Sequence, residues 1–157
     1  MKKILVIQTA SIGDVILSTP VLEKLHLYFP GSRIDILVKK GNESLFRDHP
    51  FLTDVLAWDK GSRSLVNFGR MLHRVRHNRY DLVVNLQRFF KTGLMTALSG
   101  AVMTIGFDKN PLSFLFTRKI RHKIGGVHEV TRNLSLIEGI TDNGSVKPRL
   151  YPSLLDA

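Results

Sequence analysis

Short apolar runs alternate along the chain with longer stretches of helical character, and this alternation limits the possible folds more than any other feature. The apolar runs lie at 3–7, 33–38, 54–58, 81–86 and 102–107. Several are continuously apolar and rich in β-branched residues, as expected of strands that are covered on both faces. The stretches expected to be helical lie at 13–28, 42–48, 62–77, 90–99 and 129–139. The pattern predicts an α/β fold, a Rossmann-like parallel sheet with right-handed crossovers and helices on both faces.

Length and composition indicate one ordered globular domain. The chain has 157 residues, of which 43% are hydrophobic and 23% are charged, as in ordinary globular proteins. Cysteine is absent, which excludes disulfides and cysteine metal clusters within the chain. Apolar runs stay short of the ~20 residues that a membrane-spanning helix needs. The first residues lack the cleavage site of a secretory signal, so we expect a cytoplasmic protein.

An excess of basic residues is the informative bulk property. Lysine and arginine number 23 against 13 acidic residues, which gives a net charge of +10. This balance favours anionic partners such as nucleic acid, a phosphorylated metabolite or an acidic membrane face. The basic residues gather in two runs, 60–91 and 109–132. For each run taken singly, a solvated helix face is as good an interpretation as a binding site.

The turn after the first expected strand holds the clearest candidate for a functional side chain. Thr9, Ala10 and Ser11 are small enough for a ligand to approach the backbone, and Gly13 permits a tight turn. Ligands of parallel sheets bind beyond the carboxyl ends of the strands, where helix N-termini face outward. Asp14 falls there, in the first helical turn. Spacing alone favours a structural role for Asp14, because a first-turn acid stabilises a helix by about 0.3–1 kcal/mol.

Other catalytic motifs are missing. The sequence contains no G-x-G-x-x-G, no G-x-x-x-x-G-K-[ST] and no G-x-S-x-G, the signatures of a dinucleotide site, a P-loop and a nucleophile elbow. His73 and His77 stand at i and i+4 but lack the glutamate of H-E-x-x-H, so a basic helix face explains them better than zinc. The residues by themselves predict an anion-binding α/β domain with one candidate carboxylate and no metal site.

Motifs in the stretches 3–25, 80–101, 105–120 and 128–137 resemble those of one enzyme family. The first stretch is similar to a strand followed by [ST]-x-[IM]-G-D-V and a later proline. The others are similar to Y-D-x-V-[IV]-[DN]-x-Q…K, to G-[FM]-D…PL-x-x-LF and to H-x-V-x-R-x-L, in that order. These motifs resemble the ADP-heptose:lipopolysaccharide heptosyltransferases of glycosyltransferase family 9.

The resemblance implies a two-domain GT-B enzyme. Residues 1–157 would form its N-terminal, acceptor-binding Rossmann-like domain, and the C-terminal donor-binding domain would be absent from this chain. The family transfers a heptose, with inversion, from ADP-heptose to the lipopolysaccharide inner core. Its proposed general base, the aspartate of the G-D-V turn, matches Asp14, and this changes the preferred interpretation of Asp14 to catalysis. Such a transfer needs one base, and helix amides and basic groups can steady the leaving diphosphate without a metal or cofactor.

Substrate-binding residues are expected at the same edge of the sheet. Ser11, Gly13 and Gln87 would flank the Asp14 carboxylate. Basic residues that follow expected strands or lie in loops would bind carboxylates and phosphates of the acceptor; these are Lys60, Arg63, Lys91, Arg118 and Lys119. The expected partners are an anionic lipopolysaccharide-core acceptor, a nucleotide-sugar donor held by the absent domain, and the anionic inner face of the inner membrane as a peripheral contact.

Two positions depart from the family pattern, and two other functions compete with this interpretation. Gln8 stands where many members carry a basic residue, and Arg88 replaces the glycine that commonly follows Gln87, so the acceptor sugar stays open. The first alternative is a basic α/β nucleic-acid-binding module, which would need exposed aromatic residues. We expect Phe89–Phe90 and Phe114–Phe116 in the core instead, and therefore no nucleic-acid partner. The second alternative is a non-catalytic remnant.

Overall fold

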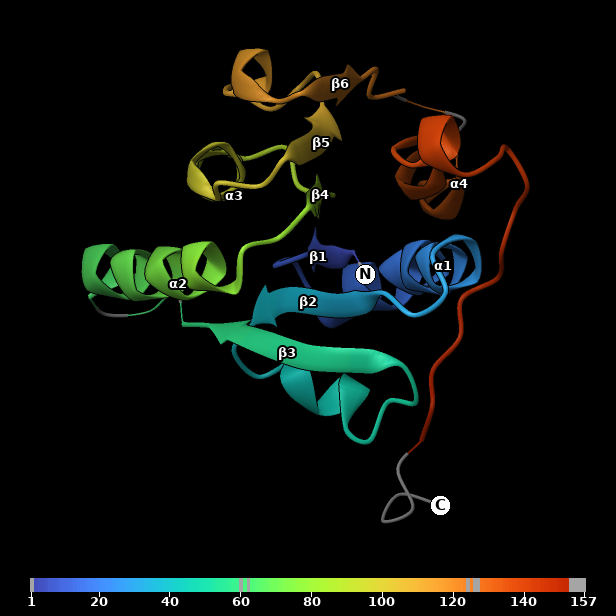
Figure 1. The fold of residues 1–157 in the computed structure, drawn as a ribbon, viewed down its shortest axis with the longest axis horizontal. Helices are drawn as coiled ribbons and strands as arrows, with labels where there is room; N and C mark the ends of the chain where they lie inside the picture. The colour runs from blue at the N-terminus through green and yellow to red at the C-terminus, as the bar shows by residue number, and fades with distance from the viewer. Residues whose placement is uncertain (1, 60, 62, 124, 126–127, 153–157) are drawn as a thin grey trace.

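The sheet runs through the centre of the molecule. A computed structural model describes residues 2–59, 61, 63–123, 125 and 128–152 (Figure 1). Within that part of the chain the sheet has six strands in the order β3-β2-β1-β4-β5-β6, and every neighbouring pair is parallel. The strands are β1 (Lys3–Ile7), β2 (Arg33–Lys39), β3 (Leu52–Trp58), β4 (Leu82–Asn85), β5 (Met103–Phe107) and β6 (Arg118–Ile120). The predicted Rossmann-like parallel sheet is confirmed.

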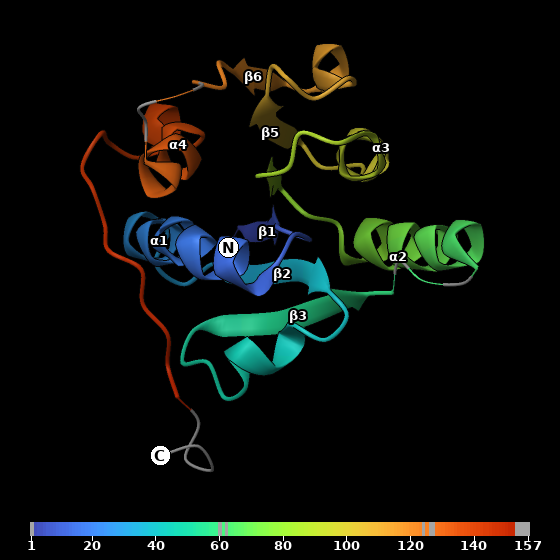
Figure 2. The same ribbon diagram turned by 180° about the vertical axis from the view of Figure 1, so that it is seen from behind.

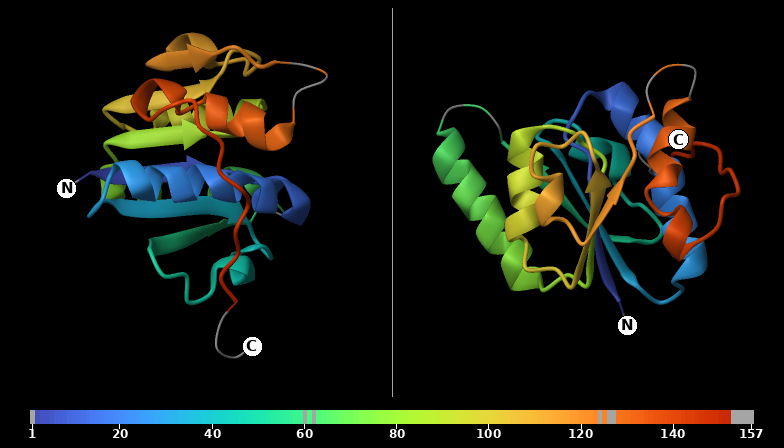
Figure 3. Two further views of the ribbon diagram at one scale, coloured as in Figure 1. Left: turned by 90° about the vertical axis from the view of Figure 1, so that its right-hand side faces the viewer. Right: turned by 90° about the horizontal axis from the view of Figure 1, so that it is seen from above.

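Helices cover both faces of this sheet, as predicted (Figures 1 and 2). One face carries α1 (Ile12–Tyr28) and α4 (Glu129–Ser135), and the other carries α2 (Ser64–Asn78) and α3 (Phe90–Leu98). Short 3-10 turns complete the connections at η1 (Glu43–Phe46), η2 (Ser113–Leu115) and η3 (Glu138–Ile140). Figure 3 shows that α1 and α3 both begin at the edge of the sheet toward which the strands point.

Alternate side chains of the strands supply the two halves of the core. In β1, Ile4 and Val6 pack in the α1 and α4 layer, while Leu5 and Ile7 pack in the α2 and α3 layer. All four are fully buried. Because both faces are covered, the strand is apolar throughout instead of alternating with polar residues, and each buried side chain contributes about 1.5–3 kcal/mol.

The structure departs from the sequence prediction at the short elements. The helix expected at 42–48 is only the 3-10 turn η1, and the last helix ends at Ser135 instead of continuing to 139. Residues 108–123, which lie outside the expected strands and helices, contain the 3-10 turn η2 and the unexpected strand β6. The sequence of β6, Arg-Lys-Ile, has no apolar run that could have revealed it. Main-chain pairing with the neighbouring β5 defines this edge strand.

Three aromatic side chains that were expected in the core lie on the surface. Phe89, Phe90 and Phe114 are 61%, 54% and 72% exposed. Phe89 and Phe90 stand at the start of α3, where the first turn projects beyond the sheet, whereas Phe116 is buried against Gly106. The prediction was therefore wrong for all but Phe116, and one argument against a nucleic-acid-binding function is removed.

Pro20 lies inside α1 without ending the helix. Proline has no N–H, so the carbonyl four residues earlier, that of Ile16, loses its usual donor. The hydroxyl of Thr19 donates to this carbonyl at 2.7 Å. The helix therefore neither stops nor restarts at the proline, because a neighbouring side chain replaces the missing donor.

An extended segment, residues 141–152, follows the last turn and runs along α1 (Figure 1); we call it the strap. The buried ammonium of Lys24 forms an ion pair of 2.7 Å with Asp142 and donates to the carbonyls of Asp142 and Gly144. The amide of Arg149 donates to the Thr19 hydroxyl at 3.0 Å. These contacts attach the strap to the helix that begins at the functional edge of the sheet.

The segment that follows β4 depends on the absence of a side chain in α3. Asn110 is buried and donates to the carbonyls of Gln87 and Phe89 at 3.3 and 3.0 Å. A Cβ atom on Gly93 would lie 2.1 Å from the Asn110 Oδ1 atom, so any larger residue must displace Asn110. The Asn110 side chain accepts a further bond from the Leu112 amide, and displacement would break all three.

We therefore expect Gly93→Ala to lower the free energy of unfolding by about 1–3 kcal/mol. Gly69→Ala is the matched control, since Gly69 lies inside α2 with no atom within 4 Å of its would-be Cβ. That substitution should raise the free energy of unfolding by about 0.5–1 kcal/mol, the usual gain for alanine in a helix. Urea unfolding followed by circular dichroism measures both; equal effects at the two glycines would contradict the packing argument.

Candidate functional site

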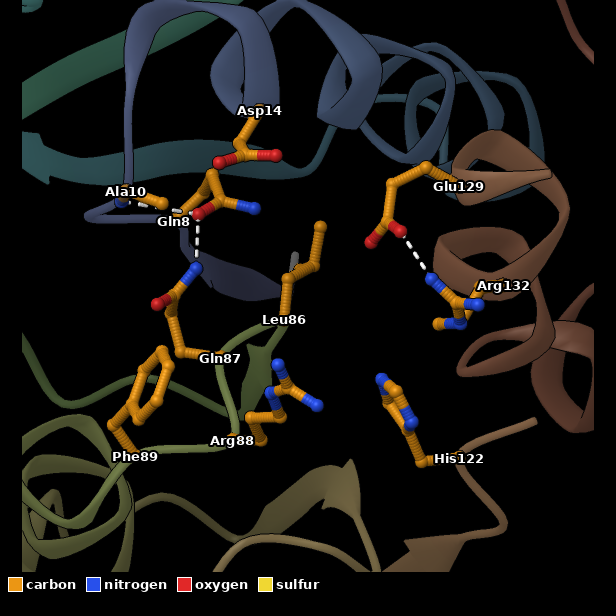
Figure 4. A pocket seen from close by; sticks show the side chains of 10 residues that line it. All are labelled: Gln8, Ala10, Asp14, Leu86, Gln87, Arg88, Phe89, His122, Glu129 and Arg132. Atoms are coloured by element: carbon orange, nitrogen blue, oxygen red, sulfur yellow. Dashed lines mark hydrogen bonds and ion pairs between the residues drawn. The ribbon is translucent and has the colours of Figure 1, made fainter. Parts of the chain in front are cut away.

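A cavity of about 350 Å³ opens at the carboxyl edge of the sheet, between the ends of β1 and β4 (Figure 4). The strand order reverses at this place, and ligands of doubly wound sheets bind at such switch points. The lining comes from the turn after β1, the segment after β4, the end of β6 and the start of α4: Gln8, Ala10, Asp14, residues 86–89, His122, Glu129 and Arg132. These four segments are far apart in the sequence, and the folding of the sheet brings them together.

Asp14 lies on the wall of this cavity, in the first turn of α1. Its side chain is partly exposed, and Figure 4 shows its carboxylate directed toward the cavity. Ser11 is the N-cap residue, but its hydroxyl donates to the Asp14 Oδ2 atom at 3.0 Å and makes no capping bond. One carboxylate oxygen is thus oriented by Ser11, and the group has access to the cavity.

Two buried glutamines join the ends of β1 and β4 beneath the cavity. The Gln8 Oε1 atom accepts hydrogen bonds from the Ala10 amide, at 3.1 Å, and from the Gln87 side-chain amide. Gln8 and Gln87 are 3% and 8% exposed. The Gln87 main-chain amide donates to Asn85 at 2.8 Å. This network fixes the two loops relative to each other, so the cavity has a defined floor.

Cationic side chains and one carboxylate form the wall opposite Asp14 (Figure 4). The Arg132 guanidinium forms an ion pair with Glu129, one turn earlier in α4, and donates from Nε to the Lys123 carbonyl at 2.7 Å. Arg88 follows Gln87 and is exposed. The Arg132 charge is therefore partly compensated within the wall.

His122 completes this wall. Its amide donates to the Asp108 carboxylate at 2.9 Å, and its ring packs edge-on against Phe107, 4.8 Å between ring centroids. Burial lowers the pKa of His122, and the nearby Arg132 and Arg88 lower it further, although Glu129 and Asp108 act in the opposite direction. The imidazole is therefore mainly neutral near pH 7.

The residues predicted from the sequence are only partly brought together. Asp14 and Gln87 line the cavity, and Ser11 touches Asp14, while Gly13 is exposed beside it. Lys60 lies outside the described residues. Arg63, the N-cap residue of α2, and Lys91, in the first turn of α3, are exposed and do not line the cavity.

Arg118 and Lys119 need a correction. We expected them in a loop at the carboxyl edge, but both lie within the edge strand β6. The Arg118 guanidinium extends along η3, where it would lie 2.9 Å from a Cβ atom on Gly139. The structure does not place either side chain with Asp14. Arg118 and Lys119 form a strand because their main chain pairs with β5. The pattern of charges in the sequence does not reveal such pairing.

Sequence reasoning did not assign the four ionisable lining residues Arg88, His122, Glu129 and Arg132 to the site. Two of them could have been found from the sequence. Arg88 replaces a glycine that is common in the family, and Arg132 is the arginine of the H-x-V-x-R-x-L motif. No sequence pattern indicated His122 or Glu129. Over the described residues, no group of three histidine or acidic side chains is arranged to hold a metal ion. None of the helices in that part of the chain combines the length and apolar character needed to cross a membrane.

The fold and the switch-point cavity define a Rossmann-like ligand-binding domain. A protein-family model described as glycosyltransferase family 9 (heptosyltransferase) matches residues 68–153, more than half of the 157-residue chain. The chain belongs to glycosyltransferase family 9. The resemblance inferred from the sequence motifs is confirmed.

Individual relatives agree with this assignment. Lipopolysaccharide heptosyltransferase 3 of Escherichia coli is 28% identical over 142 residues, covering 86% of this chain and 42% of the relative. A glycosyl transferase family 9 structure from Veillonella parvula superposes with a TM-score of 0.85 at 23% identity, covering 96% of this chain and 44% of that one. E. coli heptosyltransferase WaaC, solved with ADP-2-deoxy-2-fluoro heptose, superposes with a TM-score of 0.74 at 22% identity, covering 94% and 50%. The chain thus spans half or less of each protein.

Proposed function

We propose that this chain is the N-terminal, acceptor-binding domain of a heptosyltransferase-like inverting glycosyltransferase. The enzyme would transfer heptose from ADP-heptose to the lipopolysaccharide inner core, and a C-terminal domain outside this chain would hold the donor. The observation that carries the proposal is the Asp14 carboxylate on the wall of the switch-point cavity, in a member of family 9. The names of the relatives, which are lipopolysaccharide heptosyltransferases, support the reaction.

In the proposed reaction Asp14 acts as the general base. An acceptor hydroxyl attacks the anomeric carbon of the heptose, and the bond from that carbon to the diphosphate oxygen breaks, so that ADP leaves with the electron pair. Asp14 takes the hydroxyl proton during the attack. The Ser11 hydroxyl, 3.0 Å from Oδ2, holds one carboxylate oxygen and leaves Oδ1 to meet the acceptor.

The location follows from the acceptor. An inner-core saccharide is carried on a lipid, so the domain would work in the cytoplasm and contact the inner face of the inner membrane. The net charge of +10 supports contact with an anionic bilayer, as do the exposed Phe89 and Phe90 beside Arg88 and Lys91.

A nucleic-acid-binding module stays the second candidate. The same exposed aromatic side chains that suit a bilayer also suit base stacking in a basic groove. The Asp14 carboxylate on the cavity wall weighs against it, because it would repel a phosphate backbone.

Asp14→Asn tests the catalytic role in a protein that joins this domain to its donor-binding domain. We expect kcat to fall by roughly 10²–10⁴-fold, the usual contribution of a general base, with acceptor binding and stability nearly unchanged. Glu138→Gln is a matched control, since Glu138 is an exposed carboxylate in η3 that does not line the cavity. Transfer close to the wild-type rate in Asp14→Asn would leave Asp14 with a structural role only.

Residues 1–157 alone should neither transfer nor hydrolyse the sugar of a nucleotide donor. In the proposed arrangement the donor site belongs to the other domain, and half of an interdomain cleft provides little of the orientation that catalysis requires. Isothermal titration with ADP and a product assay measure this. Tight ADP binding with turnover by these residues would refute the proposal that the donor site belongs to the other domain.

Lys60→Ala and Lys91→Ala should each weaken binding of an anionic inner-core saccharide at low salt, because each lysine follows an expected strand in the sequence and each substitution removes a positive charge. Arg70→Ala, on the exposed face of α2, is the control for net charge and should change little. Unchanged acceptor affinity in both lysine variants would remove these residues from the site. Tight single-stranded DNA binding at physiological salt, with no saccharide binding, would instead favour the second candidate.

A further inference from the structure

The cavity has an electrostatic polarity that the proposed reaction does not use. Figure 4 shows Asp14 on one side and Arg88 and His122 on the opposite side, with Glu129 and Arg132 at the flank. Since Glu129 and Arg132 form an ion pair, their charges largely cancel. The remaining charges are the Asp14 carboxylate at one end and the Arg88 guanidinium at the other.

Arg88 is the uncompensated cation of this wall. Its side chain is exposed. The guanidinium lies over the ring of the neighbouring Phe89, with 5.7 Å between the guanidinium carbon and the ring centroid. No described carboxylate lies within ion-pairing distance of it. Arg132, by contrast, is committed to Glu129 and to the Lys123 carbonyl. An incoming anion would therefore meet Arg88 as its free partner, and a guanidinium binds carboxylates and phosphates through two parallel hydrogen bonds.

His122 stands beside Arg88 with one ring nitrogen left for a ligand. The Nδ1 atom is buried and lacks a hydrogen-bond partner among the described residues, so Nε2 is the nitrogen that can donate into the cavity. The charged groups around the ring are Arg88 from the segment after β4, Arg132 and Glu129 from α4, and Asp108 after β5. Burial is the main cause of the lowered pKa of this imidazole, and an anion bound at Arg88 would offset the further lowering by the two arginines.

We propose that Arg88 and His122 form an anion-binding subsite that determines acceptor specificity. The subsite holds a carboxylate or phosphate substituent of the acceptor sugar and thereby directs a hydroxyl of the same sugar toward Asp14. This inference rests on the proposed function for the identity of the sugar, but the binding event itself does not require transfer. A cavity of about 350 Å³ is within the size range of small-molecule sites.

The sign of the pH dependence follows from linkage. A bound anion stabilises the imidazolium, so the pKa of His122 is higher in the complex than in the free protein, where burial and the two arginines lower it. Binding therefore takes up a proton. The affinity for the anion rises as the pH falls through the interval between the pKa of the complex and the lower pKa of the free protein.

The experiment uses the 157-residue chain and three sugars that differ in the group at C6: glucose 6-phosphate carries a phosphate, glucuronate a carboxylate, and glucose an uncharged hydroxymethyl group. NMR titration at low salt, following the His122 imidazole resonances, reports both affinity and the pKa of the ring. We expect an anionic sugar to bind and glucose not to bind. Whichever of the phosphate and the carboxylate binds more tightly identifies the acceptor substituent. Equal binding of glucose, or no binding of either anion, would overturn the subsite.

Variants separate a built subsite from diffuse positive charge. Arg88→Gln should weaken the anion roughly 10- to 100-fold, the value of charge-assisted hydrogen bonds, whereas Arg70→Gln removes the same charge from the exposed face of α2 and should have little effect. His122→Asn should abolish the pH dependence of binding. Equal losses in Arg88→Gln and Arg70→Gln would show that only net charge matters, and the proposal would fail.

Failure of the subsite and failure of the proposed function can be distinguished. Asp14→Asn should leave anion binding intact, because Asp14 lies across the cavity from Arg88. If Asp14→Asn lowers transfer in the protein with both domains while Arg88→Gln leaves anion binding by the 157-residue chain unchanged, the subsite alone is wrong. If the anion binds as expected but Asp14→Asn transfers normally, the general-base role is wrong and the subsite stands.

Discussion

The pairing of β1 with β4 is the constraint on which the rest of the structure depends. The chain builds outward from β1 through β2 to β3, and α2 then returns it to the other side of β1. The next strands, β5 and β6, extend in the opposite direction. As a result the chain leaves β1 for α1 on one face and leaves β4 for α3 on the other. The loops diverge, and a crevice between them is unavoidable.

The central part of the cavity follows from this divergence. The glutamine pair, Gln8 and Gln87, spans the two strand ends and fixes the floor. The segment after β1 contributes the Asp14 carboxylate, and the segment after β4 contributes the Arg88 guanidinium. The cavity therefore has a negative side, at Asp14, and a positive side, at Arg88. A bound molecule that carries both a hydroxyl and an anionic group has one favoured orientation between them. Binding and orientation come from the same set of charges.

The sequence was sufficient for the parts of the fold that depend on burial. Strands covered on both faces, such as β1 and β4, are continuously apolar and were located within one or two residues. The position of Asp14 at the carboxyl edge could be predicted because it follows a strand and a turn of small residues. Its catalytic role was predicted only from the family resemblance and stays a prediction. β6 was missed because it is fixed by main-chain pairing, and Phe89 was misplaced because exposure at a first helical turn depends on the helix position. His122 and Glu129 line the same cavity as Asp14 only because the sheet brings distant segments of the chain together. No local sequence pattern could therefore have predicted their proximity.

Thr19 links two parts of the molecule through a single hydroxyl. The oxygen donates to Ile16 in place of the proline amide and accepts from Arg149 in the strap. The continuity of α1 and the attachment of the strap therefore share one atom. The ion pair between Lys24 of α1 and Asp142 of the strap reinforces the attachment. Displacing the strap would remove the bond that the Thr19 hydroxyl accepts from Arg149 and leave the bond that it donates to Ile16, so release of residues 141–152 can leave α1, with Asp14 in its first turn, continuous.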